Sequence, residues 1–194
     1  MRSMNERSRF LIATFCGLVL ALAVHLVIIL AVPRYAEQDA FSRLQETMTA
    51  DNAQIVSAPG GAPTWLPQPD PAVAVAACAF DLEDGPVRVS ARTGPLFQSI
   101  SLHAKGGGVF YALTDRAAVR GELELVVMTR RQLDEALAQD DESDPSRDVR
   151  IVAPRREGLV IVRVAAPLPS LRSQAEDAAK GVSCAVDAAD EGEG

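Results

Sequence analysis

Hydrophobic and polar positions are patterned most densely between residues 70 and 118. Four short runs in this block consist mainly of residues that are common in β-strands: 74–80, 86–91, 97–103 and 109–113. Segments that contain glycine, and are therefore suited to turns, separate these runs: 83–86, 93–95 and 105–108. Short strands joined by short turns are typical of consecutive antiparallel pairing. The block therefore predicts an antiparallel β meander.

The chain after this block predicts further strands and two short helices. Strand-like runs follow at 123–129, 150–153 and 159–165. Thr129 and Gln132 have the spacing of a capping box, which predicts a helix that begins there and continues to residue 138. A second helix is predicted over residues 169–180, with Gly181 as its C-terminal cap.

The last two strand-like runs are expected to pair as a hairpin, because only residues 154–158 separate them. Residues 159–162 read Leu-Val-Ile-Val and show no polar alternation. An uninterrupted apolar run of this length is typical of a strand that is buried on both faces. We therefore expect it to lie in the centre of a sheet.

Residues 10–32 form a run of 23 residues without lysine, arginine, aspartate or glutamate. At about 1.5 Å per helical residue, such a run spans roughly 30 Å of hydrocarbon. Three arginines precede it, so the positive-inside rule places residues 1–9 in the cytoplasm and exports the remainder. A cleavable signal is the alternative, since Ala21-Leu22-Ala23 has the small-x-small form of a cleavage site. Cleavage there would leave apolar residues 24–32 at a new terminus. We therefore favour an uncleaved anchor.

Residues 33–71 are expected to carry the chain away from the membrane. Phe41, Leu44 and Met48 have helical spacing, which predicts a stalk helix whose narrow apolar stripe could alternatively pair with another helix. Five prolines between residues 58 and 71 then predict a semi-rigid, extended linker. An exported β domain is expected over 72–184, followed by an acidic, disordered tail at 185–194.

Together these patterns predict a mainly β protein. We expect an antiparallel, jelly-roll-like β-sandwich of about seven or eight strands with two short helices. One N-terminal transmembrane helix precedes it.

Several short motifs in the central block also carry a resemblance. They are Asp70-Pro71, Phe-Asp-Leu-Glu-Asp-Gly-Pro-Val at 80–87, Ser-Ile-Ser-Leu at 99–102 and Phe-Tyr-Ala-Leu at 110–113. In these motifs the chain resembles a bacterial family of membrane-anchored domains of unknown function, over about residues 65–166. The resemblance implies a β-sandwich outside the inner membrane, beside a sister domain of related pattern. It implies no catalytic residues.

The net charge of −7 is concentrated in two places. Residues 134–148 hold seven acidic residues and one arginine, and residues 185–194 hold four acidic residues. The low pI is therefore weak evidence for a charged partner. No basic stripe interleaved with aromatic residues is present, so a nucleic-acid partner is not expected.

Cys78 and Cys184 are the cysteines that lie beyond the apolar run. In an oxidising compartment they are expected to pair; the alternative is two buried free thiols. A bridge between residues so far apart would contribute about 4 to 5 kcal/mol in the chain-entropy model.

One histidine and two distant cysteines rarely complete a tetrahedral site, so no metal and no cofactor are expected.

Other side chains are candidates for a ligand or partner surface. His103 lies near Ser99, Ser101 and Asp115, but without a nucleophile elbow this set is weak evidence for catalysis, and a packing or surface histidine is the preferred interpretation. The remaining candidates are Trp65, Asp81 and Arg116. Trp65 could dock on the domain or anchor a partner. Asp81, Asp115 and Arg116 could simply stabilise turns.

The preferred hypothesis is a single-pass protein of the bacterial inner membrane whose periplasmic domain is a non-enzymatic interaction module. Its partners would be the lipid bilayer, through residues 10–32, and another membrane or periplasmic protein, such as the sister β domain. The alternative is a β-sandwich that binds or processes a small envelope ligand. Catalysis is disfavoured, although the sequence does not decide it.

Overall fold

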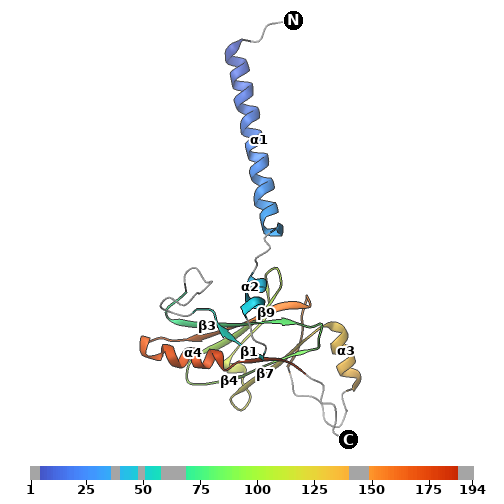
Figure 1. Cartoon of the computed structure of the whole chain (residues 1–194), viewed down its shortest axis with the longest axis vertical. Coiled ribbons are helices and arrows are strands. Elements are labelled where there is room, and N and C mark those ends of the chain that lie inside the picture. Colours follow the sequence, from blue (N-terminus) through green and yellow to red (C-terminus); the bar gives the residue numbers. More distant parts are fainter. Residues whose placement is uncertain (1–4, 36–39, 48–50, 58–68, 140–148, 188–194) are drawn as a thin grey trace. The chain divides into compact units, whose positions relative to one another are not determined.

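The computed structural model describes residues 5–35, 40–47, 51–57, 69–139 and 149–187 (Figure 1). The chain divides into two compact units, Met1–Asp39 and Ala40–Gly194. The second unit contains both sheets and is called the β domain below.

The first unit contains one long helix, α1 (Glu6–Tyr35). An 18-residue window within Glu6–Val32 has a mean hydropathy of 2.9, and none of that window is buried against other parts of the protein. Thr14 donates its hydroxyl to Phe10 O at 3.0 Å, so this polar side chain is satisfied within the helix. The helix is long and apolar enough to cross a membrane, and a signal sequence would show the same features.

The β domain contains two five-stranded sheets. Sheet A has the order β1 (Asp51–Asn52), β10 (Ser183–Val186), β4 (Val87–Arg92), β7 (Glu122–Met128) and β8 (Val149–Val152). Sheet B has the order β2 (Gln54–Ile55), β3 (Val73–Asp81), β9 (Glu157–Ala165), β5 (Gln98–Ala104) and β6 (Val109–Thr114). Neighbouring strands are antiparallel throughout, except that β7 and β8 are parallel.

Helices accompany the sheets. They are α2 (Ala40–Thr47), η1 (Asp115–Ala117), α3 (Arg130–Gln139), η2 (Pro169–Leu171) and α4 (Arg172–Lys180). The domain is therefore mixed, with two mostly antiparallel sheets and several helices. The expectation of a wholly antiparallel body with two helices needs this correction.

One hydrophobic core lies between the two sheets. Val89 and Leu125 of sheet A and Ile100 and Val162 of sheet B are all at most 1% exposed and belong to one cluster. The alternation of buried and exposed residues along β4 and β7 follows from the two faces of each strand. Helix α4 contributes Ala175, which is fully buried in the same core, and lies along one side of the sheets (Figure 1).

The helix expected to be a stalk packs instead on the outer face of sheet B. Phe41 and Leu44 of α2 are 2% and 1% exposed, and they form a second apolar cluster with residues that include Ala77 and Leu159. The apolar stripe is therefore explained by contact with the sheet. The β domain begins at Ala40 and not at residue 72, while Met48 lies outside the described residues.

The strands do not form the expected meander. β3, β4 and β5 alternate between sheets B, A and B, and among the four runs only β5 and β6 pair with each other. The expected hairpin at residues 150–165 is also wrong, because β8 lies in sheet A and β9 in sheet B. β8 follows β7 after helix α3, and a crossover of this length permits the parallel pairing that is found.

Other sequence predictions are confirmed. The Gln132 N–H donates to Thr129 Oγ1 at 3.2 Å and the Thr129 N–H donates to Gln132 Oε1 at 2.8 Å, which is a reciprocal capping box. β9 lies centrally, between β3 and β5. Its inner face is buried, while α2 covers only part of its outer face, where Arg163 remains exposed.

Candidate functional site

One side of the β domain is closed by residues 51–57, which we call the strap. β1 of the strap pairs with β10 in sheet A, and β2 pairs with β3 in sheet B. Between them, Ala53 is 4% exposed and donates its N–H to Val182 O at 2.9 Å. The strap therefore joins the edges of both sheets and places one small side chain in the core between them.

A disulfide lies beside the strap. Cys78 of β3 is bonded to Cys184 of β10, with a Cα–Cα distance of 6.6 Å. Asp51 of the strap is the register partner of Cys184, and Gln54 is the partner of Ala77, next to Cys78. The bond links sheet A covalently to sheet B on the same side that the strap closes.

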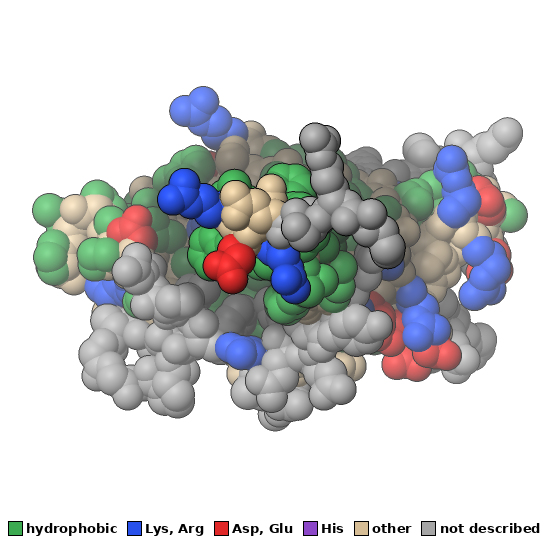
Figure 2. Space-filling view, turned by 90° about the horizontal axis from the view of Figure 1, so that it is seen from above, with side chains coloured by type: hydrophobic (Ala, Val, Ile, Leu, Met, Phe, Trp, Pro, Cys, Tyr) green, Lys and Arg blue, Asp and Glu red, His purple; other side chains and the backbone are tan. Residues whose placement is uncertain are grey.

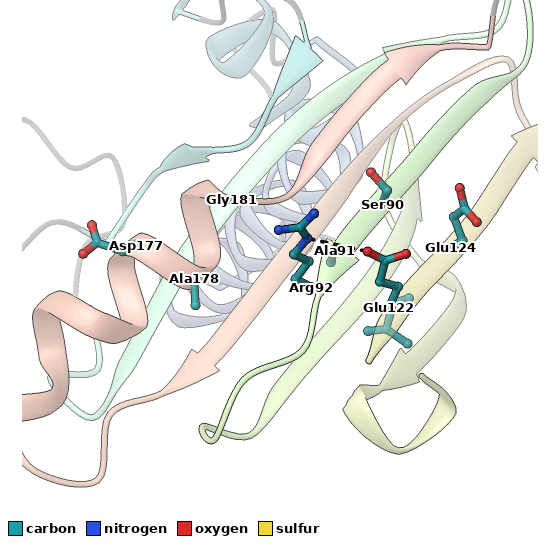
Figure 3. A pocket seen from close by; sticks show the side chains of 9 residues that line it. Ser90, Ala91, Arg92, Glu122, Glu124, Asp177, Ala178 and Gly181 are labelled. Atoms are coloured by element: carbon teal, nitrogen blue, oxygen red, sulfur yellow. Dashed lines mark ion pairs between the residues drawn. The ribbon is translucent and has the colours of Figure 1, made fainter. Parts of the chain in front are cut away.

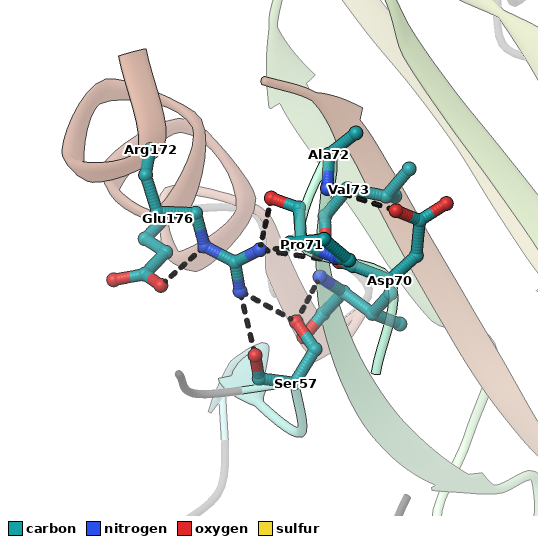
Figure 4. Close-up of polar contacts among 8 residues, drawn as sticks. Ser57, Asp70, Pro71, Ala72, Val73, Arg172 and Glu176 are labelled. Carbon is teal, nitrogen blue, oxygen red and sulfur yellow. Dashed lines mark hydrogen bonds and ion pairs between the residues drawn. The ribbon is translucent and has the colours of Figure 1, made fainter. Parts of the chain in front are cut away.

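Arg172, at the start of α4, completes this side (Figure 4). Its side chain is 12% exposed and donates to Ser57 O at 2.6 Å, to Val73 O at 3.0 Å and to Pro71 O at 3.2 Å. Its Nε pairs with Glu176 at 2.7 Å. A planar guanidinium can satisfy several carbonyls at once, so Arg172 holds the end of the strap against the beginning of β3.

Ser101 and His103 meet on the outer face of sheet B. Ser101 Oγ lies 3.1 Å from His103 Nε2 and accepts a hydrogen bond from Arg163 Nη1 at 3.1 Å. Burial, and secondly the positive charge of Arg163, lower the pKa of His103 below its ordinary value. The imidazole is therefore held in its neutral form, and Nε2 can accept the Ser101 hydroxyl proton.

This pair lacks the other parts of a hydrolytic site. Ser101 is only 7% exposed, so its oxygen is poorly accessible to a substrate. Asp115 lies in η1, beyond the far end of β6 from His103, and at about 3.3 Å per residue the separation is roughly 20 Å. The structure therefore brings Ser101 to His103 but does not assemble the set with Asp115.

The remaining sequence candidates have separate surroundings. Asp81 accepts the Glu83 N–H at 3.0 Å and pairs with Arg156 Nε at 3.0 Å, which is a turn-stabilising role. Asp115 Oδ1 is buried without a hydrogen-bond partner among the described residues, and Arg116 beside it is exposed. Trp65 lies outside the described residues.

A polar groove of about 570 Å³ lies between α4 and the paired strands β4 and β7 (Figure 3). Asp177 and Ala178 line it from the helix, and Arg92 and Glu122 line it from the sheet. Arg92 Nε and Glu122 Oε1 are 3.5 Å apart, and both side chains are largely exposed. An exposed ion pair of this kind contributes little to stability and can exchange for a ligand.

A second groove, of about 500 Å³, lies on the side opposite the strap. It runs between β6 of sheet B and the first half of β7 in sheet A, where β8 does not reach. Its lining is partly apolar, from Tyr111, Leu113, Val119, Leu123 and Val149, and partly charged, from Arg120, Glu122 and Glu124. We call this second groove, together with the free edge of β6, the open side.

The described residues show neither a concentration of one charge sign nor a group of metal ligands that would mark a specialised site. On the face drawn in Figure 2, the described Lys and Arg side chains lie among Asp and Glu side chains, without a broad area of one sign. No cluster of three or more His, Cys, Asp or Glu side chains suited to a metal ion occurs in the described part of the chain.

Sequence reasoning missed Arg172 and Gln98. Arg172 and Glu176 have ordinary i, i+4 spacing, and nothing local announces that the guanidinium reaches Ser57, 115 positions away. Gln98 is 1% exposed, and its Nε2 has no partner in the described residues. The alternation of β5 places Gln98 on the face of Ile100, so a polar residue at a core-facing position was the available signal.

No protein-family model matches the chain, and no curated protein matches it. The crystal structure of the VPA0106 protein from Vibrio parahaemolyticus is similar with a TM-score of 0.50 at 11% sequence identity, over 74% of this chain and 32% of that chain. An uncharacterised protein from Burkholderia cenocepacia gives a TM-score of 0.47 at 15% identity, over 89% of this chain and 44% of that chain. The chain thus spans less than half the length of either protein. The first likeness concerns the fold alone.

Proposed function

We propose that this chain is a membrane-anchored protein of the bacterial envelope whose periplasmic β domain, a β-sandwich, is a non-enzymatic interaction module for another membrane or periplasmic protein. Helix α1 would be an uncleaved anchor in the inner membrane, with the N-terminus in the cytoplasm. The Cys78–Cys184 bond supports this placement, since disulfides persist in oxidising compartments.

The observation that carries the proposal is the combination of α1 with the surroundings of the candidate polar groups. An apolar helix with no buried residues requires a lipid or protein environment. In the β domain, Ser101 is buried under an Arg163 hydrogen bond and Asp81 is engaged in a turn. These side chains have structural tasks, which favours binding through a surface over chemistry at a site.

Crosslinking in intact membranes tests this proposal. The full chain is crosslinked, extracted in mild detergent and purified, and co-purifying proteins are quantified by mass spectrometry. We expect one protein at near-stoichiometric amount, absent when the chain is omitted. Recovery of the chain alone, across crosslinkers of several lengths, would contradict the interaction role.

Binding of a small envelope ligand is the second candidate, and the polar groove of Figure 3 is the observation that favours it. Its volume is in the range of small-molecule sites, although it is polar and open. His103 and Asp115 do not line this groove, so they would not be the contacts. Native mass spectrometry of the purified full chain would show a bound small molecule, and the Asp177→Ala substitution should release it.

A further inference from the structure

Strand β6 forms the outer edge of sheet B. The hydrogen bonds of β5 determine which residues of β6 direct their N–H and C=O groups away from the sheet. Ala165 N–H donates to Phe97 O at 2.9 Å and Lys105 N–H to Glu157 O at 2.9 Å, so odd-numbered residues of the β5 region bond to β9. Even-numbered residues of β5 then bond to β6, which makes Ile100–Leu113 a hydrogen-bonded pair. The N–H and C=O groups of Ala112 and Thr114 therefore point out of the sheet.

The described residues give this edge none of the usual protection against pairing. Within Val109–Thr114 there is no charged residue and no proline, and every residue is at least partly exposed. Natural edge strands are normally blocked by lysine, proline or a covering segment. β6 is therefore a template to which another extended chain can add.

The groove beside β6 provides places for side chains. Tyr111 and Leu113 are the register partners of the core residues Leu102 and Ile100, so their side chains face the interior of the domain and line the groove. Val119 and Val149, 70% and 47% exposed, line the groove too. A strand paired with β6 would direct alternate side chains toward this groove, whose lining is apolar at these positions and charged at Arg120, Glu122 and Glu124.

The opposite side of the domain shows how an extended segment can close the space between the two sheets. On the opposite side the strap is an extended segment that pairs with an edge of each sheet and inserts Ala53 into the core. Among the described residues, the open side presents the same two features, a strand edge without an outer neighbour and a partly apolar groove between the sheets. An extended polypeptide is therefore the ligand whose chemistry matches this side.

We propose that the open side binds an extended segment of a different protein, which pairs with β6 through its backbone and places apolar side chains at alternate positions in the groove. This proposal rests on the interaction role proposed above and names its surface. A second copy of this chain fits less well, because its own Tyr111 and Leu113 already pack against its own core and cannot enter the groove.

The test places a photoreactive phenylalanine analogue at position 112 in the full chain, in its native membranes. The control position is 92, on sheet A, where the arginine side chain is 91% exposed. We expect a crosslink at position 112 to one protein, mapped by mass spectrometry to a segment with alternating apolar residues. At position 92 the yield of this product should be lower by about tenfold.

The Ala112→Pro substitution supplies the matched variant. It removes the outward N–H and leaves the bonds to β5 intact, whereas Ala112→Ser keeps the N–H. For this comparison the photoreactive analogue is moved to position 110. In the Ala112→Pro chain the yield of the partner crosslink should fall by roughly tenfold, as expected for one or two lost backbone hydrogen bonds. In the Ala112→Ser chain the yield should be unchanged.

Each outcome decides the proposal. A partner that crosslinks at position 92 but not at 110 or 112 would overturn the surface and leave the interaction role standing. A crosslink at 112 between two copies of this chain would overturn the choice of a different protein. Absence of any partner at all three positions would overturn both the surface and the interaction role.

Discussion

The two sides of the β domain are built differently. On the strapped side, two short strands, a disulfide and the Arg172 guanidinium hold the sheets together. On the open side, β6 ends sheet B and β8 covers only part of β7, so the described residues leave backbone groups of β6 and a partly apolar groove uncovered.

The strapped side is built from an early segment of the domain. Residues 51–57 come after α2 (Ala40–Thr47), and Arg172 binds the last residue of the strap. The contacts that close the strapped side are thus separate from the edge of β6 for which binding is proposed above.

The largest expected effect is the loss of the disulfide. The paired substitution Cys78→Ala and Cys184→Ala removes a link across 106 positions and should lower the free energy of unfolding by about 2 to 5 kcal/mol. Thermal unfolding of the full chain in detergent, followed by near-UV circular dichroism, measures the change. Cys16→Ala is the control and should have no effect; equal stability of the paired variant would mean that the strap alone closes this side.

The Arg172→Lys substitution should cost about 2 to 3 kcal/mol. An ammonium group cannot reach the carbonyls of Ser57, Pro71 and Val73 together, so the part-buried carbonyls of Ser57 and Val73 compete for one donor group. The control is Arg131→Lys, at an exposed ion pair with Glu135, which should change stability by less than about 0.5 kcal/mol. Similar effects of the two substitutions would remove Arg172 from the account of the strapped side.

His103 is expected to make a smaller contribution to stability, and this contribution depends on pH. Its pKa is lowered in the folded domain by burial and by Arg163, so below about pH 6.5 the unfolded chain binds more protons than the folded one. Stability should therefore be complete above that pH and fall as the pH drops toward the lowered pKa. Denaturation curves between pH 4 and pH 8, compared with His103→Gln, should show a shallower pH slope in the variant.

The smallest expected effect on stability is that of Ala112→Pro on the open side. The Ala112 N–H has no partner within the sheet, so the change should be within about 0.5 kcal/mol. Ala76→Pro, in β3 between β2 and β9, is the contrast and should cost about 3 kcal/mol or more. If Ala112→Pro were as damaging as Ala76→Pro, the edge of β6 would not be free.

The sequence predicted local structure better than strand pairing. Runs at 74–80, 97–103 and 109–113 correspond to β3, β5 and β6, because alternation and turn residues act over a few positions. The capping box of Thr129 and Gln132 was equally local.

What could not be predicted depends on contacts between distant residues. β1 and β2 are two residues each and exist only because β10 and β3 pair with them. The stripe of Phe41 and Leu44 has the spacing of any amphipathic helix, and its packing against sheet B is not encoded in that spacing.

The candidate site was predictable only in part. Ser101 and His103 are two residues apart on one strand, so their contact follows from alternation. The open side was not foreseen, because it requires knowing that β8 belongs to sheet A and that β6 has no outer neighbour among the described strands.

Hydrogen exchange of the purified full chain in detergent micelles, resolved to single amides, tests the contrast between the two sides most directly. The account predicts slow exchange for Ala53 and Val56, whose N–H groups bond to Val182 O and Val75 O, and slow exchange for Leu113. It predicts fast exchange for Ala112 and Thr114. Protected amides at 112 and 114, or unprotected ones at 53 and 56, would contradict the assignment of a closed and an open side.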